Sequence, residues 1–560
     1  MVHLLCSGLP AGINLLVLLG ILNHGAHAYS PPEALQFNER ADQARYQAAC
    51  PDYKMYSMYP HGPYSSGPLR LPFQRPAPQC RTFSSPLVEK VISDMDKRME
   101  DKDLARIFEN AFPNTLDTTV RWHVNATEAK KAKKRYTSRQ AAQDPDAWEG
   151  AQSFIVTGDI NAEWLRDSTN QLAQYQTLAK KDAAIHDLIL GAINTQAEYV
   201  IGSPYCNAFQ PPPPSNLAAS ANGQEDTVHP AYEPSFVFEC KYELDSLAAF
   251  LSLTNQFHAH TASSAFLTPR WYKALDTLLA VLDEQAKPTF NSETGQLELN
   301  EYRFQRQTST GTETLNLAGI GNPLAGGTGL IRSAFRPSDD ATILGFFIPA
   351  NAMMSVELKR AAAMLRAAGG KADVAAELQR RGEAIAAGVW EHGVVTHKKY
   401  GHVFAFEVDG YGSSIIMDDA NLPSLLALPL LGFVTAKDTT YQNTRRMVLE
   451  QAGNPYFLKG AEFQGIGGPH IGLQNAWPMS LLVQAMTSED DAEIEQALEF
   501  VKKASGLGLV HESVNVNTVR DYTRSWFAWA NSVFAQTILE LARRKPHLLF
   551  GEGAEPYVIE

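Results

Sequence analysis

This 560-residue chain is informative first for what it lacks. Residues 1–28 contain no Asp, Glu, Lys or Arg, and no later apolar run approaches the length that spans a bilayer. The sequence has no Gly-x-Gly-x-x-Gly or phosphate-binding loop, no Gly-x-Ser-x-Gly turn and no Cys-x2-Cys pair. These absences argue against dinucleotide-binding, serine-hydrolase and zinc-site patterns. Basic residues are also scarce, 48 against 61 acidic ones, so the net charge of −13 disfavours a nucleic acid or an anionic membrane as partner.

The uncharged segment 1–28 is typical of a secretory signal peptide. An apolar stretch over residues 13–22 precedes Ala26-His27-Ala28, a small-x-small cleavage pattern. The stretch is too short to cross a bilayer well, so we expect cleavage after Ala28 and a location outside the cell or in the secretory pathway. An uncleaved amphipathic or membrane-anchoring N-terminus is the alternative.

The cysteines agree with export. Cys6 would leave with the signal peptide, and an even number remains, namely Cys50, Cys80, Cys206 and Cys240. Four cysteines allow three pairings. We expect the two local pairs, Cys50–Cys80 and Cys206–Cys240, whereas four buried free thiols are less typical of an oxidising compartment. The single sequon, Asn125-Ala126-Thr127, predicts a glycan on Asn125.

The remaining chain divides into an arm and a helical region. Residues 29–84 are rich in Pro, Tyr, Ser and Gly and predict an ordered but irregular N-terminal arm. Residues 85–560 predict a catalytic domain, with a solvated loop in the basic segment 126–152. Helical periodicity recurs near residues 87–112, 168–180, 183–201, 242–256, 271–285, 340–367, 373–391, 422–431, 437–452, 477–487, 490–505 and 525–544. Strand patterns are few, 403–408 being the clearest. About a dozen helices predict an all-α fold, a helical toroid whose loops form a cleft at one end.

Five segments where a loop meets a helix combine carboxylates with aromatic residues and an Arg or His. They are residues 158–169, 239–246, 335–340, 465–470 and 511–527. Carboxylates accept hydrogen bonds from sugar hydroxyls, Arg and Asn donate them, and indole faces cover the C–H faces of a pyranose. Glycoside hydrolysis needs two carboxyl groups, one as acid and one as base or nucleophile. The composition of these segments therefore favours a carbohydrate-active protein.

Two of the segments offer candidates for the carboxyl pair. Ser338 is a plausible N-cap, which would place Asp339 and Asp340 in the first turn of a helix beside Arg336. Adjacent acids in a first turn are also simply favourable to the helix dipole. Glu512 follows His511 before a polar loop, and spacing alone does not distinguish it from an ordinary loop Glu. Similarly, Trp164, Arg166 and Asp167 could form an internal ion pair at a helix start.

Several motifs together resemble glycoside hydrolase family 125. They lie at residues 158–169, 241–246, 335–340, 407–412, 417–424, 454–457 and 511–531, in family order. The resemblance implies an (α/α)6 barrel and a metal-independent, inverting exo-α-1,6-mannosidase. Residues 29–84 resemble the N-terminal extension of secreted fungal members. One departure is that Ile471-Gly472 follows His470, where bacterial members tend to have a Thr/Pro-rich turn, which bears on contacts beyond the terminal sugar.

The resemblance also implies residue roles. Glu512 would be the general base, and an Asp of the 335–340 segment the general acid, with Asp339 favoured and Asp340 kept as the alternative. Because the acid must stay protonated near working pH, we expect a nearby carboxylate or partial burial to raise its pKa, and the adjacent Asp is a candidate for that like-charge effect. Candidate substrate contacts are Trp164, Arg166, Asp167, Asp245, Arg336, His470 and Arg524.

The expected reaction is removal of terminal, non-reducing α-1,6-linked mannose from mannan or N-glycans. We expect no metal, no cofactor and no obligate protein partner. One alternative is another toroid glycosidase, either a calcium-dependent α-1,2-mannosidase or a glucoamylase-like enzyme. Another is a secreted carbohydrate-binding protein that has lost catalysis.

Overall fold

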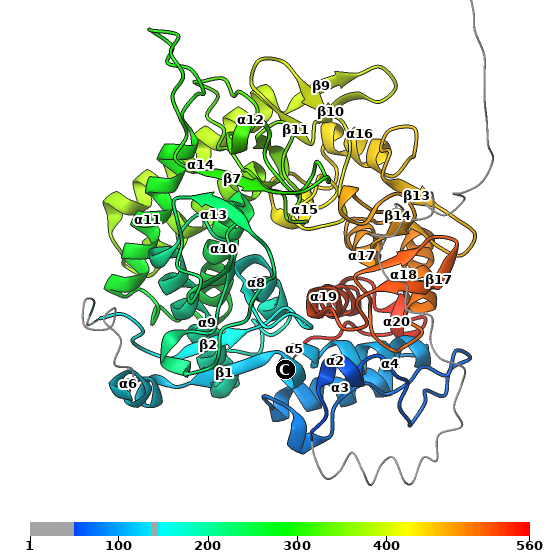
Figure 1. Ribbon diagram of the computed structural model, residues 1–560. Helices are drawn as coiled ribbons and strands as arrows, with labels where there is room; N and C mark the ends of the chain where they lie inside the picture. The colour runs from blue at the N-terminus through cyan, green and yellow to red at the C-terminus, as the bar shows by residue number, and fades with distance from the viewer. Residues whose placement is uncertain (1–49, 136–143, 145, 560) are drawn as a thin grey trace, which may run out of the picture.

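A computed structural model describes residues 50–135, 144 and 146–559. The expected signal peptide and the first part of the arm, residues 29–49, lie outside the described residues. Within the described part, helices are arranged in an inner and an outer ring (Figure 1). The inner ring contains α8 (Leu165–Ala173), α10 (Leu244–Thr261), α13 (Ile348–Ala367), α15 (Leu428–Leu431), α17 (Pro478–Met486) and α19 (Ala528–Arg544).

The outer ring contains one helix before each inner helix. These are α4 (Lys102–Ala111), α9 (Ala183–Gly202), α11 (Pro269–Gln285), α14 (Ala372–His392), α16 (Thr439–Val448) and α18 (Asp491–Ala504). The chain therefore alternates between the rings, and all six inner helices run in one direction. Their N-termini meet at the same end of the barrel. This is the (α/α)6 architecture, so the expected all-α toroid is confirmed.

The two rings differ in how their helices begin. Five of the six outer helices have a side chain that accepts a backbone N–H bond at the N-cap: Asp101, Asp182, Thr268, Asp438 and Asp490. No inner helix has such a cap. Three of them, α8, α13 and α17, instead start directly or one residue after a two-residue strand. Side chains at these starts are therefore left free for other contacts at the loop end of the barrel.

Short strands line this end. Three three-stranded sheets each contain a strand that leads into an inner helix: β3 into α8, β8 into α13 and β15 into α17. The first joins β3 (Glu163–Trp164), β4 (Ala208–Phe209) and β6 (Val237–Glu239). The second joins β8 (Phe346–Phe347), β11 (Glu407–Val408) and β12 (Ser414–Ile415). The third joins β15 (Asn475–Ala476), β16 (Ser513–Asn515) and β17 (Thr518–Thr523).

Smaller elements complete the fold. Antiparallel pairs are β1 (Val120–Val124) with β2 (Gln152–Ile155), β5 (Asp226–His229) with β7 (Arg303–Arg306), β9 (Val394–His397) with β10 (Gly401–Phe404), and β13 (Phe457–Lys459) with β14 (Gln464–Ile466). The other helices are α2 (Tyr53–Tyr56), α3 (Pro86–Arg98), α5 (Asn114–Thr118), α6 (Ala126–Arg135), α12 (Asn316–Gly319) and α20 (His547–Phe550), with 3-10 turns η1 (Pro78–Cys80), η2 (Pro213–Ser215) and η3 (Pro469–Ile471).

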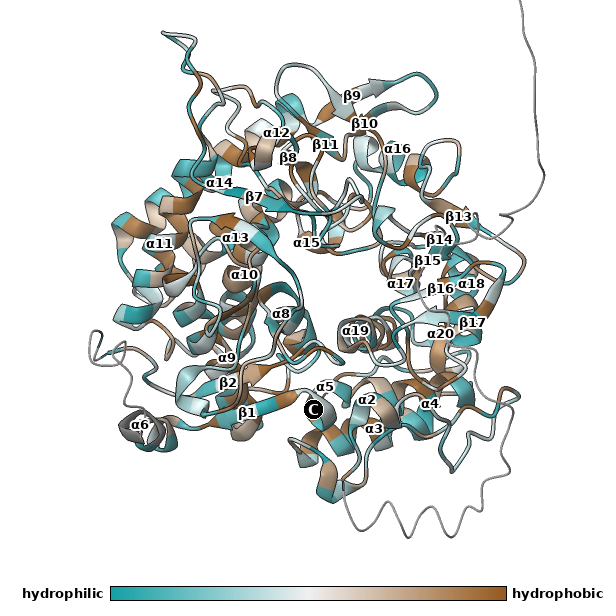
Figure 2. Cartoon of the chain, viewed as in Figure 1, coloured by the Kyte–Doolittle hydropathy of each residue, from teal (hydrophilic) through white to brown (hydrophobic). Residues whose placement is uncertain are grey.

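The core lies between the rings. In α11, buried residues recur every three or four positions, as expected of a helix with one face on the core. In the inner helix α10, every residue from Leu244 to Asn255 is buried, because neighbouring helices surround it. Figure 2 shows the same contrast, with hydrophilic residues interleaved along α11 and α14. No helix in the described part of the chain is long and apolar enough to cross a membrane.

The described part of the arm, residues 50–84, packs against the barrel. A disulfide joins Cys50 to Cys80, and a second joins Cys206 to Cys240, which is the pairing expected from the sequence. Buried Arg75 donates from Nε to the Asp117 carboxylate at 2.7 Å. The Tyr53 ring meets the Trp526 indole edge-on, with 4.9 Å between their centroids. The arm therefore reaches the loops at the open end of the barrel.

Several sequence expectations are wrong in detail. The helix expected over 87–112 is two helices, α3 and α4, because Asp101 caps a new start. The basic segment expected to be a loop contains helix α6. The helix expected over 422–431 forms only the four residues of α15, and residues 403–408 are divided between β10 and β11. The helix expected from residue 340 starts at Ile348.

Candidate active site

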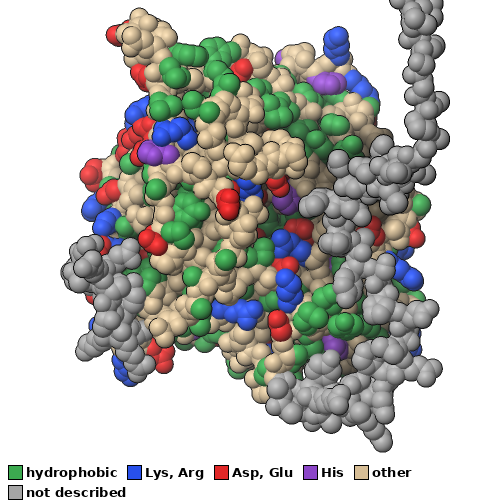
Figure 3. Space-filling view, viewed as in Figure 1, with side chains coloured by type: hydrophobic (Ala, Val, Ile, Leu, Met, Phe, Trp, Pro, Cys, Tyr) green, Lys and Arg blue, Asp and Glu red, His purple; other side chains and the backbone are tan. Residues whose placement is uncertain are grey.

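A pocket with an empty volume of about 420 Å³ lies where the loops that precede the inner helices converge. Figure 3 shows acidic, basic and histidine side chains together near the centre of this face. The pocket is lined by Thr157, Ile160, Trp164, Arg166, Asp167, Pro337, Ser338, Asp339, Asn421, His470, Trp477, Glu512, Arg524, Phe527 and Trp529. Seven of the ten sequence-predicted site residues are in this set. The other three, Asp245, Arg336 and Asp340, lie behind the lining.

Glu512 enters the pocket from the residue just before β16, and it is 7% exposed. Arg524 donates from Nε to Glu512 Oε1 at 3.0 Å and also bonds the Asp159 carboxylate through Nη1. The Arg524 backbone has a left-handed φ of 50°. This turn brings its guanidinium back to Glu512, so Arg524 orients the carboxylate.

Two further contacts hold the segment around Arg524. Gly158 pairs with Phe527, and a Cβ at this glycine would lie only 3.0 Å from the backbone oxygen of Trp526. In the arm, Lys54 Nζ lies 3.9 Å from Asp159 Oδ2. The arm and residues 158–159 therefore support the arginine that orients Glu512.

His511 does not line the pocket as its neighbour Glu512 does. Its imidazole stacks on the Tyr522 ring with 3.8 Å between centroids, and a ring nitrogen lies 3.2 Å from the Arg524 backbone oxygen. Burial lowers the pKa of His511 to about 4, against a smaller opposite effect of that hydrogen bond. The ring is therefore neutral at pH 7 and packs as an aromatic side chain beneath the pocket.

Asp339 reaches the pocket from a loop, not from a helix. The predicted N-cap at Ser338 is wrong, because α13 starts nine residues after Asp339 and the Asp339 φ is 66°, in the left-handed region. The backbone N–H of Asp339 donates to the Arg336 oxygen at 2.8 Å, which closes a tight turn. This turn directs Asp339 and Asp340 to different surroundings.

Asp340 is buried behind the pocket. Its Oδ1 lies 3.6 Å from His470 Nδ1, and its Oδ2 accepts from Ser338 Oγ at 3.3 Å. Burial works against a charged His470, yet contact with Asp340 and nearby Glu512 raises the His470 pKa to about 9. The His470 side chain is 37% exposed, so solvent weakens this effect. Asp340 therefore holds His470 at the pocket wall.

The expectation that the pKa of the acid is raised is wrong for Asp339. Burial by itself would raise that pKa, but the Lys241 and Arg166 cations outweigh burial and lower it. Another buried carboxyl group of this region is that of Glu243, which accepts from Arg166 Nη1. Glu243 belongs to the start of α10 and was not among the predicted site residues.

Arg166 organises the floor of the pocket. From the first turn of α8 it donates through Nη1 to Glu243 at 2.6 Å and to Asp245 at 3.2 Å, and its Nη2 lies 3.1 Å from Asp167. Its guanidinium carbon lies 5.0 Å from the centre of the Trp529 ring. Burial raises the pKa of Asp167 and of Asp245 to about 6 in each case, partly opposed by Arg166. Asp245 thus supports Arg166 and does not line the pocket.

Arg336 is also a supporting residue. It is buried, with Nε 3.6 Å from Glu407 Oε1 and Nη2 donating to the Ala341 oxygen at 3.3 Å. Glu407 Oε2 in turn accepts from the N–H groups of Ile343 and Leu344, each at 2.9 Å. Arg336 and Glu407 therefore fix the loop that carries Asp339.

Sequence reasoning missed several lining residues. Trp477, Phe527 and Trp529 lie at or near the starts of α17 and α19, and Asn421 precedes α15. Trp164, Trp477 and Phe527 are the N-cap residues of inner helices. An aromatic residue immediately before a helix that lacks a Ser, Thr or Asp cap was a signal in the sequence that could have identified them.

The described residues contain no group of three or more His, Cys, Asp or Glu side chains that could hold a metal ion. Three carboxyl groups, three charged donors and three indoles line one pocket at the loop end of an (α/α)6 barrel. This combination defines a glycoside hydrolase, in which paired carboxyls do acid and base work on a bound sugar.

Comparisons with known proteins name the family. Residues 101–539 match the family model of the metal-independent α-mannosidases, GH125. The chain belongs to this family. It is 54% identical over 502 residues to the meiotically up-regulated gene 157 protein of Schizosaccharomyces pombe, covering 90% of this chain and 94% of that one.

A solved structure is similar as well. It is a metal-independent α-mannosidase of Streptococcus pneumoniae, in a non-productive substrate complex with α-1,6-mannobiose. The TM-score is 0.70 at 31% identity, and the match covers 82% of this chain and 99% of that one. The fold and the enzyme class of the present chain are thus those of an α-mannosidase.

Proposed function

We propose that this α-mannosidase is an exo-acting enzyme that removes terminal α-1,6-linked mannose with inversion. The observation that carries the proposal is that Asp339 and Glu512, from distant parts of the chain, line one pocket together with Arg166 and Arg524. The buried Arg166 cluster closes the pocket floor, which favours a chain end over a continuous chain. Crystallisation of the Streptococcus pneumoniae relative with α-1,6-mannobiose supports the linkage.

In the proposed mechanism, Glu512 removes a proton from a water molecule that attacks the anomeric carbon of the bound mannose. Asp339 gives a proton to the glycosidic oxygen as the C–O bond breaks. Arg524 keeps the Glu512 carboxylate oriented toward the pocket. We assign the acid role to Asp339 and not to Asp340, because Asp339 lines the pocket while Asp340 is buried against His470.

The remaining pocket residues would hold the mannose. Arg166, Asp167 and His470 offer donors and acceptors for hydroxyl groups, and Trp164, Trp477 and Trp529 offer apolar ring faces. Asp245 and Arg336 would contribute indirectly, since they hold Arg166 and the Asp339 loop in place. We expect mannan or N-glycans as the natural source of such chain ends.

We also propose that the protein is an exported glycoprotein. The two disulfides suit an oxidising compartment, and Asn125 is exposed at the start of α6. N-terminal sequencing of exported protein tests this, and a sequence that begins at Met1 would contradict it. A glycan on Asn125 should be removable by an endoglycosidase.

The test of the activity is hydrolysis of α-1,6-, α-1,2- and α-1,3-linked mannobiose, each with and without a chelator. We expect release of mannose from the α-1,6 isomer alone, unchanged by chelation, with β-mannose as the first anomer detected by proton NMR. Loss of activity on chelation with preference for the α-1,2 isomer would favour a calcium-dependent α-1,2-mannosidase. Binding without hydrolysis would favour a non-catalytic protein.

A further inference from the structure

The described part of the arm contacts the turn that carries Arg524. The Oγ atoms of Ser57 and Ser525 lie 3.0 Å apart in a hydrogen bond, and the Tyr53 ring meets the Trp526 indole edge-on, with 4.9 Å between their centroids. Tyr53 is the first residue of α2, and Ser57 is the C-cap of the same short helix. The arm therefore touches the two residues that directly follow Arg524.

The turn at Arg524 depends on contacts of this kind, because its φ of 50° lies in the left-handed region. This conformation is unfavourable for a residue with a side chain and persists only where the surroundings enforce it. On the barrel side, a His511 ring nitrogen lies 3.2 Å from the Arg524 oxygen, and Phe527 pairs with Gly158. The arm holds the two residues between these points, so the turn is fixed along its whole length.

The helix α2 is itself held firmly enough to serve as a support. Ser57 is fully buried, and the Tyr53 hydroxyl accepts from Nδ2 of Asn114, on helix α5 of the barrel, at 3.4 Å. The disulfide between Cys50 and Cys80 crosslinks the chain just before α2 to a later part of the arm. Burial and the crosslink thus limit how far α2 can move away from the turn.

We propose that the arm is part of the catalytic apparatus, because Tyr53 and Ser57 fix the turn from which Arg524 orients Glu512. This inference rests on the proposed role of Glu512 as general base. Arg524 Nε donates to Glu512 Oε1 at 3.0 Å, so a displaced turn withdraws that donor and lets the carboxylate rotate away from the attacking water. Tyr53 and Ser57 are thus positioning residues. They lie outside residues 101–539, the part of the chain that matches the family model.

The test is the double variant Tyr53→Leu, Ser57→Ala, which removes both contacts and keeps an apolar side chain at position 53. A small displacement of a reacting group costs up to about 100-fold in rate. We expect kcat to fall about 10- to 100-fold for α-1,6-mannobiose and equally for an activated aryl α-mannoside, because both reactions need the base. The residues that line the pocket are unchanged, so KM should stay within about 3-fold of wild type.

Azide supplies a readout that a mere loss of folded enzyme would not move. It attacks the anomeric carbon as an anion, so no proton has to be removed and no base is needed. With the aryl mannoside, azide should restore turnover of the double variant and yield β-mannosyl azide, while the aryl group leaves as its phenolate with the electrons of the broken bond. An unchanged kcat, or a loss that azide does not relieve, would overturn the proposal.

Tyr64→Leu, Ser66→Ala is the matched control, because it changes the same residue types at exposed positions of the same arm. It should keep kcat within about 2-fold of wild type and show no response to azide. If the first double variant does not fold, Ser57→Ala alone removes the bond to Ser525 and should lower kcat for both substrates about 3- to 10-fold. An unchanged kcat would again overturn the proposal. A wild-type enzyme inactive on both substrates would instead refute the proposed function itself.

Discussion

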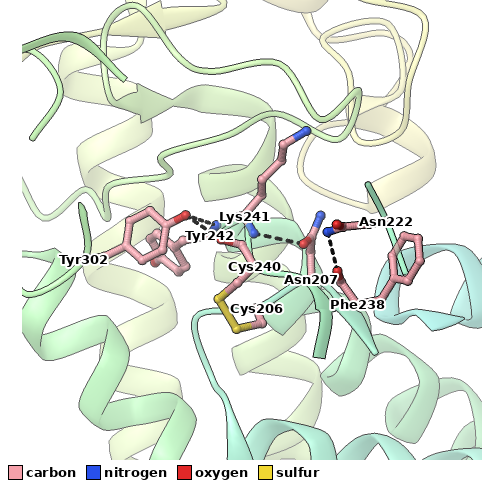
Figure 4. The surroundings of a disulfide bond; sticks show 8 residues. All are labelled: Cys206, Asn207, Asn222, Phe238, Cys240, Lys241, Tyr242 and Tyr302. Atoms are coloured by element: carbon pink, nitrogen blue, oxygen red, sulfur yellow. Dashed lines mark hydrogen bonds between the residues drawn. A yellow bond between two sulfur atoms is a disulfide. The ribbon is translucent and has the colours of Figure 1, made fainter. Parts of the chain in front are cut away.

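Asn207 donates from Nδ2 to Oδ1 of Asp339 at 3.0 Å, although 132 positions separate the two residues in the chain. The Asn207 oxygen accepts from the backbone N–H of Lys241, also at 3.0 Å, which determines how the amide is turned (Figure 4). The disulfide Cys206–Cys240 joins the residues immediately before Asn207 and Lys241. The disulfide is therefore next in sequence to Asn207, which donates to Asp339, and to Lys241, whose charge lowers the pKa of Asp339.

Replacement of Asn207 by Ala should slow the acid step. A hydrogen bond to a charged group contributes about 1.5–3 kcal/mol, so kcat for α-1,6-mannobiose should fall about 10- to 100-fold. Turnover of an activated aryl mannoside should change much less. Asn222→Ala is the control, because Asn222 is in the same region but donates to the Phe238 backbone oxygen (Figure 4). Equal kinetics of the two variants would show that the bond to Asp339 has no catalytic importance.

Glu512→Gln should abolish turnover of every substrate, because it removes the base while keeping the shape and a hydrogen-bonding oxygen for Arg524. We expect a fall in kcat of about 10³-fold or more for both mannobiose and aryl mannoside. Binding of α-1,6-mannobiose, measured by calorimetry, should stay within about 10-fold of wild type. Substantial residual activity would mean that another group activates the water.

The two adjacent aspartates should give different kinetic patterns. Asp339→Asn should lower mannobiose turnover by about 10²- to 10⁴-fold and aryl mannoside turnover far less, as expected for loss of a general acid. Asp340→Asn should affect both substrates alike, because Asp340 contacts His470 and Ser338 behind the pocket. Steady-state kinetics of both variants with both substrates show which aspartate is the general acid. The reverse pattern would assign this role to Asp340.

Glu163 should make stability depend on pH. Burial raises its pKa to about 8, although its carboxyl group accepts from the Ile155 N–H at 2.9 Å. Between its ordinary value of 4.5 and about 8, the folded state holds a proton that the unfolded state has released. The free energy of unfolding therefore falls as pH rises through this range, by at most about 1.4 kcal/mol per pH unit from this group.

Glu163→Gln removes the contribution of this carboxyl group to the pH dependence of the free energy of unfolding. Relative to wild type, the variant should gain stability progressively from pH 5 to pH 8 in denaturant titrations. Glu284→Gln is a suitable control, because Glu284 lies on α11 at the outer ring and pairs with Lys287 near the surface. A constant difference between Glu163→Gln and wild type at all pH values would show that the Glu163 pKa is not raised.

The outer ring was largely predictable from the sequence. Its helices combine a periodic apolar face with an N-cap at Asp182, Thr268 or Asp490, and the observed starts agree with the expected ones within a few residues. Two inner helices were harder to delimit. Both lack a side-chain cap, and α13 starts at Ile348 and not near residue 340, while α15 starts at Leu428 and not near residue 422. Local capping chemistry marks an outer helix, whereas tertiary packing determines where an inner helix begins.

Local motifs identified the chemistry of the pocket but not the partners of each group. Asp339 and Glu512 could be selected from their segments, and both line the pocket. Asp340, the sequence neighbour of Asp339, turns out to face His470, while Asn207 donates to Asp339 from another part of the ring. Nothing in the residues around Asn207 marks it as a neighbour of the acid.

The sequence by itself determined the helical class and the residue types of the pocket, because periodicity and motif composition are properties of neighbouring residues. It left three disulfide pairings open, and the structure contains the two local ones. Only the tertiary structure decided that Arg166, Asp245 and Glu243 form one charged cluster and that Asn207 donates to Asp339. Closing the two rings brings together loops that are hundreds of residues apart. Burial and charge at that junction, and not sequence adjacency, determine the surroundings of each carboxyl group.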